Sequence, residues 1–368
     1  MLKRFRIQSF KAIGELDIAL ERLTVLVGPN ACGKSSVLQA MSMLCQMRDK
    51  SPNEIVAGDV QAIQELTTRD ATASLLLRAE GESFAVEWCA NRASKGQWSD
   101  SDEDAPSLVC ERAGNHRAYA NFWNQPSVPV DDDQRIPDTR FLPRVELFRF
   151  ELEYLVAPAE VSPAPRLSSN GRGLAAVLGQ LVLEYPDVFQ RIKQAARTII
   201  PSIRDIRLRN TKLSASALLP GQQPNFPAFE LLFDTRSGGG IPAHAMSDGT
   251  MRVLALLTAA LGHDAPNLIL LDDIERGVHP RAMVELVRLL QRTLEEVPDL
   301  QIVATTHSPD LLDQLEPAQI RLLSLGDDGL TRCVAMNEHA DFDAWRDVMS
   351  PGEMWSVMDP AGTDQDAS

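Results

Sequence analysis

The sequence predicts an α/β protein in which helices cover a mixed, largely parallel sheet. Three observations carry this prediction. Continuous apolar runs at 267–271 and 301–306 are each followed by a helical pattern, as expected for parallel strands that are buried on both faces. A third apolar run, 23–27, leads through a glycine-rich turn into a helix whose apolar residues recur at helical spacing.

The remaining elements follow from local periodicity and from capping residues. In chain order we expect strands at 2–9 and 16–20, a hairpin with strands at 73–79 and 83–89, helices at 173–184 and 186–199, a helix that Ser247 caps and Gly262 closes, a helix at 280–296, and another begun by Ser308 and Pro309. The stretch from 91 to 143 is polar, proline-rich and acidic, which predicts a long surface excursion.

This pattern divides the chain into four segments. They are the N-terminal half of the main α/β lobe at 1–115, an inserted and largely helical lobe at 116–245, the C-terminal half of the main lobe at 246–335, and a tail at 336–368 whose end we expect to be disordered.

Composition is that of a reduced globular protein. Of the 368 residues, 44% are hydrophobic, yet no run approaches the roughly 18 apolar residues that a membrane span needs. The five cysteines show no CxxC spacing, so neither a zinc site nor a disulfide framework is expected. The net charge of −15 argues mildly against nucleic-acid binding. We expect a cytoplasmic protein without a membrane partner.

Residues 28–35, GPNACGKS, fit the phosphate-binding pattern G-x-x-x-x-G-K-[ST] between a predicted strand and a predicted helix. Small residues allow the backbone N–H groups to turn toward phosphate, and the helix N-terminus adds its dipole. Lys34 can reach the β- and γ-phosphates of ATP, and the Ser35 hydroxyl can bind Mg²⁺. The predicted ATP-binding residues are Gly28, Pro29, Asn30, Ala31, Cys32, Gly33, Lys34, Ser35 and Ser36.

Two acids follow the apolar run at 267–271. Asp272 is the expected Mg²⁺ ligand, and Asp273 is the expected activator of the attacking water. His307 ends the next predicted strand, so it would lie near the γ-phosphate if the two strands are neighbours.

The ordered set GPNACGKS, MSDGTMRVLALLTA, LILLDDIERGVHP and ATTHSPDLLDQL resembles the ABC-type ATPases of the OLD/RecF/SMC group, and the OLD-like branch in particular. The resemblance implies an ABC-ATPase head fold with N-terminal antiparallel strands. It implies that Ser247, Asp248 and Gly249 contact ATP on the opposite subunit of a homodimer. It also assigns catalytic roles to Lys34, Asp273 and His307 and matches Glu275 to an acid of the family.

The chain departs from the family in two respects. Asp273 stands where the family usually has glutamate, and its carboxylate is withdrawn by about 1.5 Å, one C–C bond. We therefore expect either that ATP hydrolysis is slow or that Glu275 shares with Asp273 the activation of the attacking water. The glutamine of the family's Q-loop has three candidates, Gln46, Gln125 and Gln134.

Spacing narrows the class of ATPase. Only 239 positions separate Lys34 from Asp273, which is too few for long coiled-coil arms, and 61 residues follow His307, which is too few for the nuclease domain of OLD proteins. The resemblance then implies an ATP-dependent dimerising switch. It would act on DNA or on a separately encoded effector such as a nuclease, in DNA repair or phage defence. The alternatives are a nucleotide-gated scaffold with negligible turnover and, less in keeping with the motifs, a transporter subunit.

Two further features have a functional and a plainer interpretation. A basic cluster could contact double-stranded DNA or could be a solvated helix face followed by a polar strand; it comprises Arg191, Lys193, Arg197, Arg204, Arg207, Arg209 and Lys212. Cys32 lies at a helix N-terminus, where thiol pKa values tend to fall, or it is a small residue tolerated in the loop.

Overall fold

A computed structural model describes residues 1–50, 55, 75–90, 107–112, 115–120, 139–214 and 225–357. Its internal contacts divide the chain into two compact units. The first unit comprises Met1–Leu147, Leu270–Asp272 and Asp299–Ser368, and the second comprises Phe148–Ile269 and Asp273–Pro298. Among the helices in the described ranges, none has the length and apolar character that a bilayer crossing requires.

The first unit is built on a six-stranded sheet. Its strand order is β16 (Thr331–Ala335), β15 (Ile320–Leu325), β3 (Leu23–Val27), β14 (Gln301–Thr306), β13 (Leu268–Leu271) and β8 (Val145–Phe148). β3 runs parallel to both β14 and β15, and Val27 lies opposite Thr306. Every residue of β3, β13 and β14 is buried, which explains why polar and apolar residues do not alternate along these strands.

A second, antiparallel sheet belongs to the same unit. Its strand order is β2 (Ile13–Ala19), β1 (Leu2–Phe10), β4 (Leu75–Gly81), β5 (Phe84–Ala90), β6 (Ser107–Arg112) and β7 (Asn115–Ala120). β1 and β2 form a tight hairpin, with Ile13 paired with Phe10 and Lys11 in the left-handed region at φ 55°.

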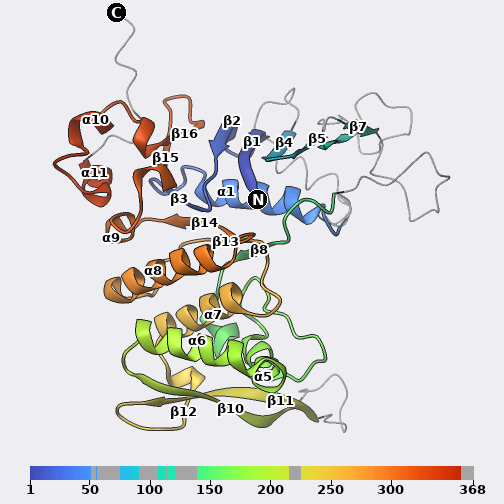
Figure 1. The fold of residues 1–368 in the computed structure, drawn as a ribbon, viewed down its shortest axis with the longest axis vertical. Helices are drawn as coiled ribbons and strands as arrows, with labels where there is room; N and C mark the ends of the chain where they lie inside the picture. The colour runs from blue at the N-terminus through green and yellow to red at the C-terminus, as the bar shows by residue number, and fades with distance from the viewer. Residues whose placement is uncertain are drawn as a thin grey trace, which may run out of the picture. The chain divides into compact units, whose positions relative to one another are not determined.

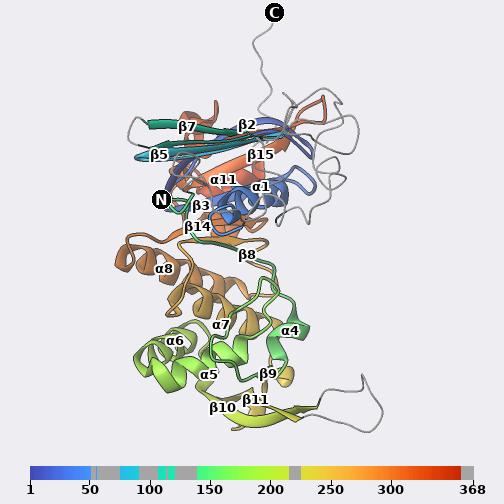
Figure 2. The same cartoon turned by 90° about the vertical axis from the view of Figure 1, so that its right-hand side faces the viewer.

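Helix α1 (Lys34–Gln46) lies between these two sheets, in contact with β1 and β4 on one side and with β14 on the other (Figure 1, Figure 2). Ser35 is its one exposed residue, and Ser36, Gln39 and Gln46 are half-buried. Short helices complete the unit; they are α9 (Pro309–Leu312), α10 (Phe342–Trp345) and α11 (Pro351–Val357), with 3₁₀ turns η2 (Pro317–Gln319) and η3 (Met336–Glu338).

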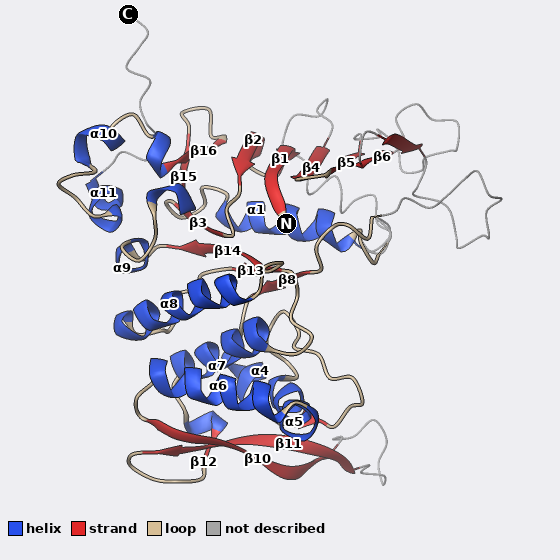
Figure 3. Ribbon diagram, viewed as in Figure 1, coloured by secondary structure: helices blue, strands red, loops and turns tan. Residues whose placement is uncertain are grey.

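The second unit packs helices against a β-ribbon. Its helices are α4 (Leu152–Val156), α5 (Leu174–Glu184), α6 (Pro186–Ile199), α7 (Asp248–Leu261) and α8 (Pro280–Glu296), with a 3₁₀ turn η1 (Ala243–Ala245). The ribbon pairs β10 (Ile203–Ser214) with β11 (Asn225–Thr235), and β11 also pairs with β12 (Ile241–Pro242) and β9 (Ala159–Glu160). Helices α5 to α8 lie on one side of the ribbon (Figure 3).

Two expectations from the sequence need correction. The polar stretch 91–143 contains two strands, β6 and β7, which extend the antiparallel sheet; its remainder up to 138 lies outside the described residues, as does the tail from 358. The lobe expected to be largely helical also contains the long ribbon. Residues 246–269 and 273–298 join that lobe in the second unit because α7 and α8 both pack against α6.

Candidate functional site

The loop at 28–35 connects β3 to α1 and depends on two glycines. A Cβ on Gly28 would lie 2.3 Å from the carbonyl oxygen of Leu323 and 2.7 Å from Cys32 Sγ, so a side chain cannot fit there. Gly33 has φ 99°, and a Cβ on it would lie 2.6 Å from Thr331 Oγ1. The hairpin β15–β16 therefore lies directly behind the loop and fixes its path.

Lys34 is turned back over this loop. Its Nζ donates hydrogen bonds to the carbonyl oxygens of Gly28, at 2.9 Å, and Pro29, at 2.8 Å. Its side chain is buried, whereas Pro29, Asn30 and Ala31 form the exposed rim of the loop. Lys34 Nζ also lies 3.9 Å from Cys32 Sγ. A buried ammonium bonded to neutral groups can exchange those bonds for charge-assisted bonds to phosphate.

One carboxylate connects the loop to the parallel sheet. Asp272 follows β13, and its Oδ1 accepts a hydrogen bond from Ser35 Oγ at 2.9 Å and another from Thr305 Oγ1, also at 2.9 Å. The structure thus brings together Ser35 and Asp272, the two residues predicted to bind Mg²⁺, although 237 positions separate them. The sequence argument did not identify Thr305 as a site residue. The feature that could have indicated it is a hydroxyl side chain near the end of a predicted buried strand.

The donor set at this point suits Mg²⁺. A hydroxyl and a carboxylate are hard oxygen ligands, and Mg²⁺ is typically held by one or two such protein groups while phosphate oxygens and water complete its shell. Asp272 is half-buried and Ser35 is exposed, so a phosphate can reach the same face. These residues therefore fit the metal that the motifs predict.

His307 follows β14 at the same edge of the sheet. β14 lies between β3 and β13 in the strand order, and its last residue, Thr306, pairs with Val27, immediately before Gly28. The neighbouring strands that the sequence argument required are therefore present. The side chain of His307 is exposed at this edge.

Cys32 does not have the properties that its functional interpretation, a reactive thiol at a helix N-terminus, requires. It is fully buried beneath Gly28, and burial raises the pKa of its thiol even though Lys34 acts in the opposite direction. The interpretation that gave this thiol a lowered pKa is therefore wrong, and the plainer interpretation, a small residue tolerated in the loop, fits a thiol that faces the interior. Cys32 contributes to the loop through its backbone and its small size.

The structure argues against one of the three candidates for the Q-loop glutamine, Gln46. Gln46 lies in the last turn of α1, bonded to Ser42 at 2.9 Å and to Lys50 at 3.0 Å. That position is about 18 Å along the helix from Lys34, at 1.5 Å per residue, which is too far to contact the same phosphates. Gln125 and Gln134 lie outside the described residues.

The second unit holds the SDGT motif at the start of α7. Ser247 caps the helix, with its Oγ accepting from the Thr250 backbone N–H at 3.3 Å and lying 2.9 Å from Thr250 Oγ1. Asp248 Oδ1 accepts from Arg252 Nε at 2.7 Å. A Cβ on Gly249 would lie 2.2 Å from the carbonyl oxygen of Gly277, so the motif packs against the turn that precedes α8.

That turn carries the acids Asp273 and Glu275. Asp273 is exposed and has φ 55°, a left-handed conformation that aspartate, asparagine and glycine tolerate better than other residues. Its carbonyl accepts from the Arg276 N–H at 3.0 Å, and the Glu275 carbonyl accepts from the Val278 N–H at 2.9 Å. The backbone conformation thus gives a physical reason for aspartate in place of the family's glutamate.

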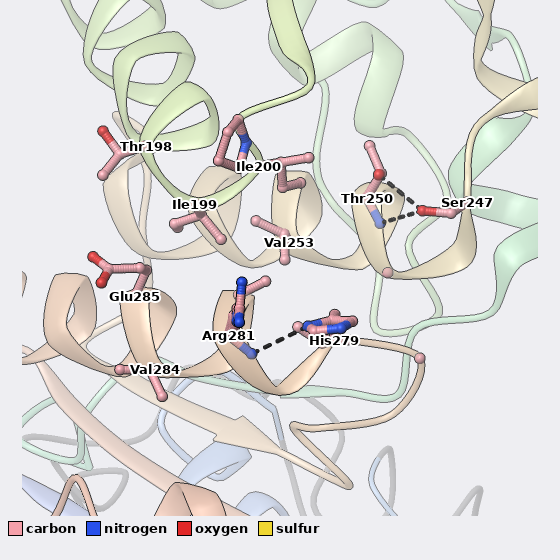
Figure 4. A pocket seen from close by; sticks show the side chains of 15 residues that line it. Thr198, Ile199, Ile200, Ser247, Thr250, Val253, His279, Arg281, Val284 and Glu285 are labelled. Carbon is pink, nitrogen blue, oxygen red and sulfur yellow. Dashed lines mark hydrogen bonds between the residues drawn. The ribbon is translucent and has the colours of Figure 1, made fainter.

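A cavity of about 650 Å³ lies beside these motifs (Figure 4). Its polar end is formed by the starts of α7 and α8, with Ser247, His279 and Arg281. His279 caps α8, and its Nδ1 accepts from the Arg281 N–H at 3.2 Å. Apolar side chains such as Ile199 and Val253 line its middle, and Thr198 and Glu285 lie at the end away from Ser247.

The basic cluster is largely neutralised by acids within the second unit. The recorded ion pairs are Arg191–Glu296 at 2.7 Å, Lys193–Asp205 at 2.5 Å, Arg197–Asp205 at 3.2 Å, Arg207–Asp234 at 2.5 Å and Arg209–Glu230 at 2.6 Å. Arg204 and Lys212 are exposed and carry no ion pair within the described residues. The cluster therefore offers less unpaired positive charge to a nucleic acid than the sequence suggests.

Comparisons with protein-family models agree with these motifs. The model described as "AAA domain, putative AbiEii toxin, Type IV TA system" matches residues 116–313, more than half of the chain. A second model, described as "AAA ATPase domain", matches residues 1–94, which contain the phosphate-binding loop.

Two curated proteins are similar over shorter segments. Septu protein PtuA of Bacillus mycoides (strain KBAB4) is 31% identical over 86 residues, which cover 21% of this chain and 12% of that protein. An OLD nuclease of Thermus scotoductus (strain ATCC 700910 / SA-01) is 39% identical over 44 residues, covering 12% of this chain and 8% of the nuclease. The matched segments thus span about a tenth of either relative.

Solved structures support the fold over nearly the whole chain. An Smc head bound to the C-winged helix domain of ScpA aligns with a TM-score of 0.58 at 12% identity, covering 90% of this chain and 97% of that one. An Smc head with a coiled coil and joint, from Pyrococcus yayanosii, aligns with a TM-score of 0.53 at 9% identity, covering 92% of this chain and 98% of that one. The predicted α/β head fold is confirmed. The chain belongs to the family described as "AAA domain, putative AbiEii toxin, Type IV TA system" and is a P-loop ABC-type ATPase of the OLD/SMC group.

Proposed function

We propose that this chain hydrolyses ATP with Mg²⁺ and dimerises around the nucleotide, as a switch on DNA or on a separately encoded effector. The observation that carries the proposal is the double hydrogen bond to Asp272 Oδ1. It places the Ser35 hydroxyl of the loop and the Thr305 hydroxyl of the sheet on one carboxylate, each at 2.9 Å. Such a cluster at the N-terminus of α1 suits a metal-bound triphosphate.

Each predicted site residue has a defined task in this proposal. The loop N–H groups and Lys34 hold the phosphates, while Ser35 and Asp272 hold Mg²⁺, which supplies charge neutralisation when it is bound. Asp273 or Glu275 accepts a proton from the attacking water, and His307 orients the γ-phosphate. Ser247 and Gly249 contact the nucleotide of a second copy, because they lie at a helix N-terminus beside an open cavity.

Steady-state hydrolysis tests the first half of the proposal. Specific activity is measured against protein concentration, with and without duplex DNA, and Lys34→Ala serves as the blank. A specific activity that rises with concentration supports ATP-dependent dimerisation, and a further rise with DNA supports the DNA-linked switch. A flat rate at the level of Lys34→Ala contradicts hydrolysis.

Mixing two inactive variants tests whether the SDGT motif acts on the opposite subunit. Lys34→Ala removes the phosphate-binding side chain, and Ser247→Arg blocks the contact to a second copy. In an equal mixture each heterodimer contains one intact site, so we expect about a quarter of the wild-type rate in a closed two-fold dimer. A mixture as inactive as its components contradicts action between subunits.

One observation favours the alternative of a nucleotide-gated scaffold. The carboxylate of Asp273 is short, and its left-handed backbone at φ 55° limits how far the side chain can be redirected. Nucleotide binding by calorimetry, together with a rate equal to that of Lys34→Ala, would favour the scaffold. The pathway and the DNA or protein partner enter the proposal through family likeness only. The exposed Arg204 and Lys212 are the first residues to substitute in a test of DNA binding.

A further inference from the structure

Asp248 forms an ion pair with a buried arginine inside the SDGT motif. It is the first residue of α7, and Arg252 lies one turn further along the same helix. Arg252 Nε donates to Asp248 Oδ1 at 2.7 Å, and the arginine side chain is only 9% exposed. The Asp248 side chain is 35% exposed, so only the guanidinium is buried. Loss of the carboxylate would leave that buried charge without this partner, and the ion pair therefore favours one position of the carboxylate.

The second carboxylate oxygen of Asp248 faces the neighbouring turn. A Cβ on Gly277 would lie 2.9 Å from Asp248 Oδ2 and 3.2 Å from Asp248 Cγ. Gly277 is also left-handed, at φ 72°, which further favours glycine there. The carboxylate therefore rests directly on the backbone of the turn at 273–278.

A second contact joins the same two segments. The carbonyl oxygen of Gly277 occupies the space that a Cβ on Gly249 would need. The two glycines thus allow the two turns to touch through their backbones, while the Asp248–Arg252 pair covers the junction. All of these residues belong to the second unit.

We propose that Asp248 is a positioning residue and not a nucleotide ligand. Tied to Arg252, it holds the turn at 247–249 against the turn at 273–277, so that the surface offered to a second copy and the acids Asp273 and Glu275 move as one rigid piece. This inference rests on the proposed function, because it deepens the role of the SDGT motif in ATP turnover. It also explains how an anionic side chain can occupy a phosphate-facing turn, since Arg252 neutralises the carboxylate and draws it inward.

Hydrogen exchange tests the clamp without any need for ATP. Asp248→Asn keeps the shape of the side chain but removes its charge, and Arg252→Lys keeps the charge but loses the guanidinium. Exchange of peptides spanning 273–279 is followed by mass spectrometry. We expect Asp248→Asn to speed exchange of the Arg276 and Val278 amides about tenfold, and Arg252→Lys to act in the same direction.

Asp343→Asn is the matched control. Asp343 pairs with Arg346 one helical turn away, at 3.2 Å, and its side chain is 85% exposed in the first unit. We expect this variant to exchange like the wild type across 273–279. If Asp248→Asn leaves those amides unchanged relative to wild type, the clamp does not exist and the inference is overturned.

Kinetics then separate the clamp from general stability. In an enzyme that turns over, Asp248→Asn should lower kcat roughly five- to tenfold and change the KM for ATP by a smaller factor, because Lys34 and the loop that hold the phosphates lie outside the clamp. An unchanged kcat overturns the positioning role even if exchange is faster. A wild type without hydrolysis contradicts the proposed function, and the exchange result still decides whether the clamp exists.

Discussion

Replacing Gly249 by alanine should loosen the junction between the two turns of the second unit. The new Cβ would stand 2.2 Å from the Gly277 carbonyl oxygen, 3.1 Å from its carbon and 3.2 Å from Val278 Cα. All three atoms are backbone, so no rotamer change can relieve the contact. The two segments must move apart by roughly 1 Å to reach an ordinary separation of about 3.4 Å.

The magnitude follows from two opposed effects. Overpacking of this kind costs about 1–3 kcal/mol, whereas alanine in place of glycine within a helix favours the folded state by about 0.5–1 kcal/mol. We expect a net loss of about 1–2 kcal/mol in the free energy of unfolding. With a denaturant dependence of about 3 kcal/mol/M, the urea midpoint should fall by roughly 0.3–0.7 M.

Gly238→Ala provides the comparison for this assay. A Cβ on Gly238 would meet no atom within 4 Å, so the urea midpoint should equal or slightly exceed that of the wild type. Unfolding is followed by far-ultraviolet circular dichroism on the full chain. A Gly249→Ala midpoint at or above that of Gly238→Ala would refute the reasoning, because the close approach of the two backbones would then be easily relieved.

Three further results are expected. Ser35→Ala removes one hydroxyl from Asp272, so Mg²⁺-dependent hydrolysis should fall about 10–100-fold in a coupled assay while the urea midpoint stays unchanged. Burial alone would raise the pKa of Asp205, but its hydrogen bond from Lys193 lowers it below the usual value. The stability that this pair contributes is therefore present above the unfolded pKa of about 3.9 and is lost as pH falls below it. Asp205→Asn should lower the free energy of unfolding by about 1 kcal/mol at pH 7 and by less at pH 3. An equal loss at both pH values contradicts the pairing. Burial raises the pKa of the Cys45 thiol to about 12, so iodoacetamide at pH 8 should modify it in urea and spare it in the native protein, as mass spectrometry will show.

Four elements of the fold could be predicted to the residue. β3, β14, α6 and α8 have the bounds that the sequence indicated, because their apolar runs are continuous or because proline marks the first helical turn. β2 begins three residues earlier than expected, at Ile13 instead of 16. Its start is set by the tight hairpin with β1, a tertiary feature that periodicity does not reveal.

Strands in polar sequence could not be predicted in the same way. β6 and β7 lie in a stretch whose composition is that of a loop, and they pair as an extension of the sheet at β5. For β10 the sequence offered a polar strand as one of two interpretations of its basic residues. Its arginines at 207 and 209 find their partners Asp234 and Glu230 only when β10 is paired with β11. Cross-strand pairing therefore decided these elements, and it depends on residues remote in sequence.

The candidate site also contains residues that the sequence predicts and residues that it does not. The pairing of Ser35 with Asp272 could be predicted because both belong to motifs with fixed positions at strand ends. Thr305 and Arg252 could not, since their importance lies in a partner side chain and not in a motif. The left-handed backbone of Asp273 was equally hidden, although it explains the one residue that departs from the family's pattern.

The burial of α1 between two sheets has a consequence for how this protein can be divided. The antiparallel sheet covers one side of the helix through β1 and β4, and the parallel sheet covers the other through β14. A fragment that begins at 116 contains neither α1 nor β3, and one that ends at 94 leaves α1 without β14. Neither fragment can complete the nucleotide site, so each of the two segments that match separate family models lacks part of what buries α1 or forms the phosphate-binding loop.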